Sequence, residues 1–407
     1  MKRICLILVF LFCSYFSEAQ PGKIDIAIAD TLYSKILNEK RPLRIYVPES
    51  QSFGIYTQKN NEYPVLFLLD AEWHFLFTAG MIHQLSSING NTICPEMIIV
   101  GIDNIDRARD FTPSFDPQFA TSGGYDKFIS FIEKELIPYI NSAYRVKPYR
   151  ILMGHSLGGL AVIKTLLQHK ELFNAYIALD PSMWWQNQSF LKESEIILVD
   201  RQFTDRTLFL GLANSMEKGM DTVQVKRDNQ RSTLHIRSAL EFSKYLSRNK
   251  NNQLKFKFNY YENETHASLP LIGTYDALHF LFSFYNLPLT YKDYADTSMN
   301  LVYKIENHYK SISHRMGYIV SPPELTIYSL ASTALMKNEY SKAKYLFELN
   351  IKNYPDSFNA YDSYGDYLLA VKDEKNAFIM FSKALSIMEN AATREKLVKL
   401  SGNVKNF

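Results

Sequence analysis

The residues most suited to chemistry in this 407-residue chain lie in the run Gly154–Gly159, which reads GHSLGG. The run follows the apolar stretch Arg150–Met153 and precedes the helix-like stretch Leu160–His169. A serine placed in this way between a strand and a helix occupies a strained turn, and glycines let the two elements approach closely. This context predicts that Ser156 is a nucleophile at the carboxyl end of a sheet.

A serine hydroxyl is a weak nucleophile and needs a base, most often a histidine that a carboxylate orients. After an elbow of this kind the chain order is serine, acid, histidine. Eight of the nine histidines are poor candidates. His74, His83 and His155 precede Ser156, and His169 ends the helix-like stretch after it. His235 and His279 lie in helical patterns, and His308 and His314 follow the end of the α/β pattern. His266 lies in a polar loop after the strand-like stretch Leu254–Tyr261 and is the predicted general base.

The acid has three candidates. Glu217 is the first, because a triad acid usually sits on the loop that follows the strand-like stretch Thr207–Leu212. Asp221, four residues on, is the second. Asp180, at the end of the stretch Ala175–Leu179, is the third, since some hydrolases take the acid from there. A serine–histidine dyad without a close acid also stays open.

Two backbone N–H groups are expected to stabilise a developing oxyanion. The first is the N–H of Leu157, at the start of the helix that follows the serine. The second is expected from the loop Leu69–Phe75, where the N–H of Ala71 or Glu72 would serve. Side-chain identity says little at these positions because the donors are main-chain groups.

Three further side chains on the same edge of the predicted sheet are candidates for substrate binding. Trp184 and Trp185 form a pair that is as easily a packing wedge as a substrate wall. Arg109 stands beside Asp110, and an ion pair between them is favoured over a clamp for an anionic substrate group.

Short apolar runs alternate with amphipathic helical patterns from about residue 40 to residue 290. Continuous apolar runs are typical of central strands covered on both faces. The expected strands are Leu43–Val47, Pro64–Leu69, Met97–Ile102, Arg150–Met153, Ala175–Leu179, Thr207–Leu212 and Leu254–Tyr261, and the expected helices are Tyr125–Ile140, Leu160–His169 and Leu234–Ser247. This alternation predicts an α/β fold with a doubly wound, mostly parallel sheet.

Strand patterns stop after Pro288, and an internal period begins near Ser321. Ala343 and Phe347 recur 34 residues later as Ala377 and Phe381. The period and the small and aromatic residues predict two tetratricopeptide-like repeats, followed by a further helix over Ala391–Leu400. Because so short an array is not stable alone, it should pack on the α/β domain, on the helical stretch Leu301–Arg315 or on a second subunit.

The N-terminus has the pattern of a secretory signal peptide. Lys2 and Arg3 precede the apolar run Ile4–Phe12, and Ser17–Ala19 ends in small residues. The run is about half of the ~20 residues that span a bilayer. Cleavage after Ala19 is therefore predicted, with a lipoprotein anchor at Cys13 as the alternative. The expected domains are a signal peptide (1–19), an α/β domain (20–288), a helical linker (289–320) and repeats (321–407).

Composition and charge exclude several classes of protein. The chain is 46% hydrophobic and 21% charged, which is typical of folded domains rather than of a disordered chain. Forty-five basic against 42 acidic side chains give a formal charge of +3, so nucleic-acid binding through a basic surface is not expected. Cleavage would leave Cys94 as the single cysteine, which excludes an internal disulfide.

At this point the sequence resembles a known family. The runs Val65–Asp70, Ile99–Asn104, Arg107–Pro113, Arg150–Gly159 and Asp180–Trp185 are similar to the putative esterase family of α/β-hydrolases, which is related to siderophore and feruloyl esterases and esterase D. The resemblance covers about residues 30 to 285. Within that family the chain resembles a bacterial subgroup that carries C-terminal tetratricopeptide repeats.

The resemblance implies hydrolysis of a small or sugar- or siderophore-type carboxylic ester through an acyl-enzyme on Ser156, with His266 as base and no metal or other cofactor. The expected partners are the ester and, through the repeats, a protein or a second copy of the chain. Nucleic acid and a membrane span are not expected, and the protein is expected in the periplasm or outside the cell. An acyltransferase with the same residues, or a binding protein with an inactive hydrolase domain, stays open as an alternative.

Overall fold

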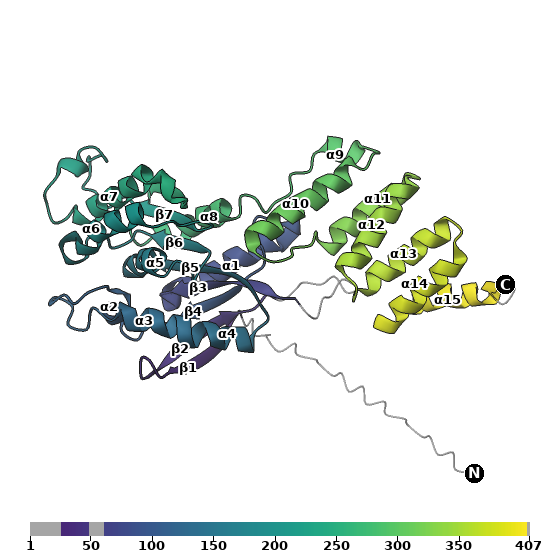
Figure 1. Ribbon diagram of the computed structural model, residues 1–407, viewed down its shortest axis with the longest axis horizontal. Coiled ribbons are helices and arrows are strands. Elements are labelled where there is room, and N and C mark those ends of the chain that lie inside the picture. The colour runs from purple at the N-terminus through teal and green to yellow at the C-terminus, as the bar shows by residue number, and fades with distance from the viewer. Residues whose placement is uncertain (1–25, 49–60, 405–407) are drawn as a thin grey trace, which may run out of the picture.

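A single eight-stranded sheet organises the first part of the molecule (Figure 1). The computed structural model describes residues 26–48 and 61–404. The strand order is β1-β2-β4-β3-β5-β6-β7-β8, in which β1, β2 and β4 pair antiparallel and all other neighbours pair parallel. The strands are β1 (Ile28–Ser34), β2 (Glu39–Tyr46), β3 (Tyr63–Leu69), β4 (Ile98–Ile102), β5 (Val146–His155), β6 (Ala175–Leu179), β7 (Thr207–Ala213) and β8 (Lys255–Tyr261).

The predicted strands correspond to β2 through β8, and the doubly wound α/β fold is confirmed. The sequence did not reveal β1. This strand lies at the edge of the sheet, pairs only with β2 and leaves most of its side chains exposed or half-buried. It therefore lacks the continuous apolar run that marks the buried strands β3, β4 and β6.

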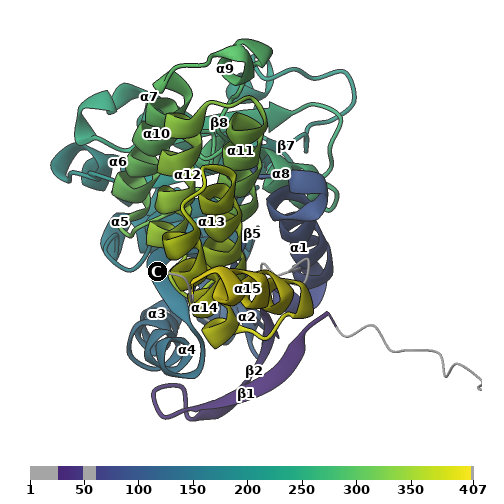
Figure 2. The same cartoon turned by 90° about the vertical axis from the view of Figure 1, so that its right-hand side faces the viewer.

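Helices cover both faces of the sheet, and the view in Figure 2 separates them. One face packs against α1 and α8, and the other against α3 to α6. The helical elements are α1 (Ala71–Ser86), α2 (Arg107–Phe111), α3 (Tyr125–Phe131), a π-helical turn (Ile132–Leu136), α4 (Ile137–Ala143), α5 (Leu157–Gln168), α6 (Trp185–Asp200), α7 (Leu234–Arg248) and α8 (Leu269–Leu281).

Two segments expected as loops are the starts of helices. The segment Leu69–Phe75 turns at Asp70, whose φ of 56° is left-handed, and then enters α1 at Ala71. The segment after β6 enters α6 at Trp185. Neither helix start carries a side-chain cap hydrogen bond; at α1 the carboxylate of the N-cap residue Asp70 accepts from Asn104 and Arg107 instead.

The chain ends in a run of helices that lies beside the α/β part (Figure 1). These are α9 (Tyr291–Ala295), α10 (Asn300–Met316), α11 (Glu324–Met336), α12 (Tyr340–Asn353), α13 (Phe358–Ala370), α14 (Glu374–Ile387) and α15 (Ala391–Val404). A Cβ on Gly365 of α13 would lie 2.5 Å from the ring of Phe381 in α14, so this glycine permits their close packing. The helical character is confirmed; the tetratricopeptide classification and the domain limits stay predictions.

Helix α10 contributes to two apolar cores. Ile312 and Met316, near its end, are buried with Tyr149 and Phe282 of the α/β part. Nearer its start, Leu301, Val302 and Ile305 are buried with α11, α12 and the later helices. Helix α10 therefore joins the α/β part to the helical array.

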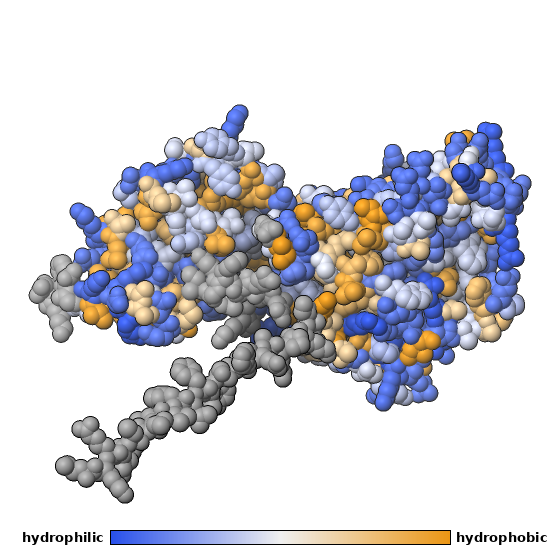
Figure 3. All heavy atoms as spheres, turned by 180° about the vertical axis from the view of Figure 1, so that it is seen from behind, coloured by the Kyte–Doolittle hydropathy of each residue, from blue (hydrophilic) through white to orange (hydrophobic). Residues whose placement is uncertain are grey.

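The predicted signal peptide and Cys13 lie outside the described residues. Cys94 is buried, and burial raises the pKa of its thiol to about 12, as fits a structural thiol. Figure 3 shows apolar patches dispersed over a largely hydrophilic surface. In the described part of the chain, none of the helices combines the length and apolarity needed to cross a bilayer.

Candidate active site

Ser156 occupies the turn between β5 and α5, and its backbone is strained. Its φ of 57° and ψ of −117° are unusual for a residue with a side chain. The turn is tight because glycines surround it: a Cβ on Gly154 would lie 2.5 Å from the carbonyl of Gly158, and one on Gly159 would lie 3.0 Å from Pro181. The sequence GHSLGG therefore folds as the elbow that its pattern predicts.

The predicted oxyanion donors all lie at helix starts. Leu157 is the first residue of α5, and Ala71 and Glu72 are the first two of α1. The first N–H groups of a helix have no partner within the helix and carry its positive end. Since β3 and β5 are neighbours in the sheet, both helix starts lie at the same carboxyl edge. The structure thus brings these three candidates to the edge where Ser156 lies.

His266 lies in the segment between β8 and α8, and its Nδ1 is 2.5 Å from Oδ2 of Asp180. Asp180 is fully buried directly after β6, and the N–H of Ala213 donates to its Oδ1 at 3.2 Å. Burial alone would raise the pKa of this carboxyl, but contacts with His235 and His266 outweigh burial and hold its pKa well below the usual range. Asp180 is therefore a buried carboxylate aimed at His266.

The other two candidates for the acid lie elsewhere. Glu217 is exposed, and its Oε1 accepts a 3.4 Å hydrogen bond from Ser232. Asp221 is exposed and accepts from the N–H groups of Val223 and Gln224, which makes it the organiser of a local turn. Of the three carboxylates considered from the sequence, the structure brings only Asp180, the third choice, to His266.

A second histidine approaches the same carboxylate. His235, in the first turn of α7, places Nε2 3.2 Å from Oδ2 of Asp180. The contact is close, but its direction falls short of a well-aligned hydrogen bond. The imidazoles of His235 and His266 meet at 90° with centroids 5.3 Å apart. The sequence assigned His235 to ordinary helix packing, because helical periodicity gives no sign of a carboxylate that arrives from another strand.

Asp180, His235 and His266 hold three potential metal-ligand atoms within 4.8 Å of one another. Two ligands at about 2.0–2.2 Å from a tetrahedral zinc would be more than 3 Å apart. The 2.5 Å between Nδ1 of His266 and Oδ2 of Asp180 is too short for that arrangement. The geometry of this cluster fits direct hydrogen bonding better than a shared metal ion.

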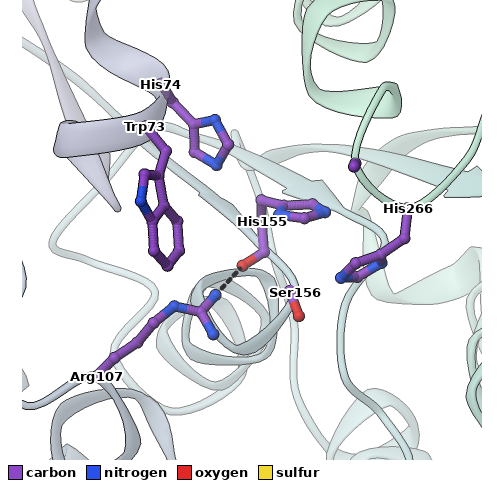
Figure 4. Close-up of a pocket in the computed structure, with 7 residues that line it drawn as sticks. Trp73, His74, Arg107, His155, Ser156 and His266 are labelled. Carbon is purple, nitrogen blue, oxygen red and sulfur yellow. Dashed lines mark hydrogen bonds between the residues drawn. The ribbon is translucent and has the colours of Figure 1, made fainter.

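A cavity of about 320 Å³ opens over the elbow (Figure 4). It is lined by Trp73, His74, Arg107, His155, Ser156, His266 and Ala267. Figure 4 shows Trp73 and Arg107 on one side and His266 on the other, with Ser156 between them. The serine hydroxyl lies 3.4 Å from the hydroxyl of Ser182. Ser156 and His266 therefore share one cavity, where a substrate could contact both.

The three side chains predicted to bind substrate lie outside this lining. Trp185 is fully buried, and its Nε1 donates to the carbonyl of Ser114 at 3.2 Å. Trp184 is half-buried and packs against the same core. Arg109 donates to Glu39 at 2.8 Å and to Asp110 at 2.7 Å. The tryptophans are packing residues here, and Arg109 forms the structural ion pair that the sequence favoured.

The cavity wall contains Trp73 and Arg107 in place of the predicted Trp184, Trp185 and Arg109. Trp73 is 61% exposed, and the guanidinium of Arg107 lies 5.4 Å from its ring centroid. Arg107 is held by Asp70, at 2.6 Å and 2.9 Å, and by the carbonyl of His155 at 3.0 Å. The sequence showed only a tryptophan shortly after an expected strand; its exposure and its place in the first turn of α1 come from the structure.

The cavity wall also carries two buried imidazoles. His155 lies between His74 and His266, with ring centroids 5.5 Å and 4.4 Å away. Burial, reinforced by the neighbouring imidazoles, lowers the pKa of His155 to about 3, and burial also lowers that of His74. Both are therefore neutral near pH 7, whereas Arg107 in the same lining carries a charge.

Comparisons with known proteins agree with this fold. A family model described as Putative esterase matches residues 34–271. The matched region is more than half of the chain, and the chain therefore belongs to this family. The ferri-bacillibactin esterase BesA of Bacillus subtilis (strain 168) is 30% identical over 175 residues, and the siderophore enterobactin esterase of Emericella nidulans is 29% identical over 149 residues.

These matches are partial. They cover 36% and 32% of this chain, and the chain spans 59% and 49% of those relatives' own lengths. A crystal structure of an IroE-like serine hydrolase from Shewanella oneidensis is 31% identical, with a TM-score of 0.65, and the match covers 80% of this chain and 98% of that one. The siderophore hydrolase EstA of Aspergillus nidulans, at 22% identity and a TM-score of 0.54 over 67% of this chain and 99% of that one, shares the fold.

Proposed function

We propose that this protein hydrolyses carboxylic esters, with Ser156 as nucleophile, His266 as base and Asp180 as acid. The observation that carries the proposal is that the elbow serine and the histidine bonded to a buried carboxylate line one cavity. Membership of the esterase family supports the reaction class. Asp180 replaces Glu217 in this proposal because Asp180 contacts His266.

In each half of the proposed reaction His266 takes up one proton and then gives it away. His266 takes the proton from the Ser156 hydroxyl as its oxygen attacks the ester carbonyl, and the N–H groups of Leu157 and of Ala71 or Glu72 stabilise the oxyanion. The C–O bond to the alcohol then breaks, and His266 returns the proton to that alcohol. Water then attacks the acyl carbonyl while His266 takes its proton; the bond between the acyl group and Ser156 breaks, and His266 returns that proton to the serine oxygen as the acid leaves. Asp180 stabilises the imidazolium that forms twice in this cycle.

The cavity wall favours an aromatic ester that carries negative charge. Trp73 offers an exposed aromatic face, and Arg107 offers a guanidinium beside it. An aromatic ring can stack on an indole face, and a guanidinium binds oxygen anions well. One relative is named a siderophore enterobactin esterase and another a ferri-bacillibactin esterase, which supports a siderophore-type ester as the substrate.

A fluorophosphonate probe tests the nucleophile. We expect one adduct, on Ser156, in the folded unmutated protein and none in the Ser156→Ala protein. An ester panel of aryl, feruloyl, acetylated-sugar and catechol-siderophore esters then tests the substrate class, with Ser156→Ala as the blank. Loss of at least ~10³-fold in rate is expected for Ser156→Ala and for His266→Ala. A folded protein that the probe leaves unlabelled would contradict the proposal.

Export is part of the proposal, and it rests on the N-terminal sequence pattern alone. The basic pair, the short apolar run and the small residues ending at Ala19 support cleavage by a signal peptidase. Expression of the full chain followed by cell fractionation and N-terminal sequencing tests it. A mature protein that begins at Gln20 in the exported fraction is the expected result, and a full-length cytoplasmic protein would oppose it.

A further inference from the structure

Asp180 is a buried carboxylate whose ion-pair partners, among the residues described here, are two imidazoles and no lysine or arginine. Its Oδ1 accepts from the backbone of Ala213, while Oδ2 faces both Nδ1 of His266 and Nε2 of His235. A buried carboxylate is costly unless it is paired and hydrogen-bonded. One imidazole would satisfy the catalytic geometry, so the second needs an explanation of its own.

We propose that His235 is a positioning residue for the ester-hydrolysis site: its Nε2–H holds the Asp180 carboxylate in the orientation that fixes His266. The inference rests on the proposed function for its kinetic consequence, but not for the contact itself. His235 lies outside the cavity lining, so it acts through Asp180 and not on the substrate.

The geometry around Asp180 indicates what His235 adds to the hydrogen bond from His266. Asp180 has a left-handed backbone with φ of 46°, directly at the end of β6. Its carboxylate can rotate about the Cα–Cβ and Cβ–Cγ bonds unless both oxygens are held. The Ala213 N–H holds one oxygen at 3.2 Å, and His235 approaches the other from the opposite element, α7. With both oxygens fixed, Oδ2 stays in line with Nδ1 of His266.

The tautomers follow from the same contacts. A carboxylate oxygen accepts hydrogen bonds, so the nitrogens that face it carry protons: Nε2 of His235 and Nδ1 of His266. In that tautomer Nε2 of His266 is free to accept the proton of Ser156. A small rotation of the His235 ring improves the alignment of its 3.2 Å contact. His235 and His266 then share one oxygen, and each limits how strongly the other binds it.

The test compares His235→Leu with His235→Gln, because a glutamine amide can replace the Nε2–H donor and leucine cannot. We expect kcat to fall roughly tenfold to a hundredfold in His235→Leu, as for a modest misplacement of a catalytic group, with KM nearly unchanged. His235→Gln should recover most of that loss. His279→Leu is the matched control, since His279 of α8 likewise has a buried Nε2 but, among the described residues, is not an ion-pair partner of Asp180.

A second readout needs no turnover. The proton between Nδ1 of His266 and Asp180 should give a far-downfield ¹H NMR resonance in the resting protein, and this resonance should move in His235→Leu and stay nearly in place in His235→Gln. Unchanged kcat and an unmoved resonance in a folded His235→Leu protein would overturn the inference. So would a His235→Gln protein as impaired as His235→Leu.

The two proposals fail in different ways. If ester hydrolysis by Ser156 is wrong, the fluorophosphonate adduct and the activity lost in Ser156→Ala are absent, while the NMR comparison still reports on His235. If only the role of His235 is wrong, Ser156 is labelled at the normal rate in every His235 variant. If His235→Leu does not fold, the position of the resonance in His235→Gln decides, because loss of that resonance would contradict replacement by an amide donor.

Discussion

Two residues of the same chemical type can have different roles in this molecule, one at the cavity and one in the surrounding structure, because their positions differ slightly. Arg107 and Arg109 are two residues apart on the short helix α2, yet Arg107 lines the cavity and Arg109 pairs with Glu39 on another element. Asp180 and Glu217 follow neighbouring strands, but only the buried Asp180 contacts His266. The burial of a side chain and the residue that it contacts therefore decide whether it can react, and its residue type alone does not.

The acid assignment predicts opposite outcomes for two matched substitutions. Asp180→Asn keeps the size of the side chain but loses the charge that stabilises the His266 imidazolium, so kcat should fall by up to about 10⁴-fold. Glu217→Gln should leave kcat near the unmutated value, since Glu217 contacts Ser232 on the surface. Steady-state kinetics on an aryl ester, with unfolding curves for both proteins, make the comparison. A large loss in Glu217→Gln alone would return the acid role to that residue.

The buried His155 predicts how stability depends on pH. Burial lowers its pKa to about 3, against an ordinary value of 6.5, so between these values the unfolded chain binds a proton that the folded chain does not. Stability should therefore fall as pH falls through this range, with a contribution of up to about 1.4 kcal/mol per pH unit. His155→Gln should remove that contribution and flatten the curve.

Urea unfolding of both proteins between about pH 6.5 and pH 4 measures this difference. Asp180 does not contribute in this range: its pKa is lowered, so the stability it provides is fully present above its ordinary value of 3.8 and is lost only below it. Parallel curves for His155→Gln and the unmutated protein would show that His155 is already accessible to protons.

At the scale of elements, glycines have two different roles in this fold. Gly154 lies where a side chain would meet the backbone of Gly158, whereas Gly80 lies inside α1 with open space where a Cβ would be. The first glycine is required by a close approach of two chain segments. The second only adds flexibility to the unfolded chain.

Alanine substitutions at these glycines should therefore have opposite signs. Gly154→Ala should destabilise the protein by about 1–3 kcal/mol or more, because the extra methyl group has no space beside a backbone carbonyl. Gly80→Ala should stabilise it by about 0.5–1 kcal/mol, the usual difference between alanine and glycine inside a helix. Denaturant unfolding reads both effects, and a stable Gly154→Ala protein with full activity would contradict the tight elbow.

Local patterns explain what the sequence could predict. The elbow, the apolar runs of β3 to β7 and the loop histidine His266 depend on residues close together in the chain, and these predictions agree with the structure. The pairing of Asp180 with His266 and His235 joins residues 86 and 55 positions apart, since 266 − 180 = 86 and 235 − 180 = 55. It depends on how β6, β8 and α7 are aligned, which no local pattern contains. The same holds for Trp73, which reaches the cavity because β3 and β5 are adjacent.

At the scale of the whole molecule, the two parts meet at the edge of the sheet away from the cavity. Ser156, Asp180 and His266 follow the carboxyl ends of their strands. Helix α10 instead packs against Tyr149, which precedes the buried end of β5, and Lys147 lies 5.4 Å from the ring of Tyr318 just after α10. The helical array is therefore attached at the amino edge and does not line the cavity.

This arrangement predicts that contacts of α10 affect stability and not catalysis. Ile312→Ala removes a buried side chain from the core that α10 shares with the sheet, and should cost about 2–5 kcal/mol. The temperature at which activity is lost should fall, while kcat/KM at room temperature stays unchanged. Ile305→Ala on the same helix is the control, because its side chain is buried among the array helices.

Activity assays after heating, with circular dichroism melts, separate the two variants. The activity of Ile312→Ala should be lost at a lower temperature than that of Ile305→Ala, whose main effect should be on the helical signal. A fall in kcat/KM at room temperature in Ile312→Ala would show that the array influences the cavity after all.

The attachment of the array at the amino edge also bears on how a substrate arrives. A bulky ester can encounter the cavity from solvent without any movement of α11 to α15, so the rate of encounter should depend on diffusion and on the charge of Arg107. Access to the site is thus controlled by the α/β part of the molecule, which supplies every residue of the cavity lining.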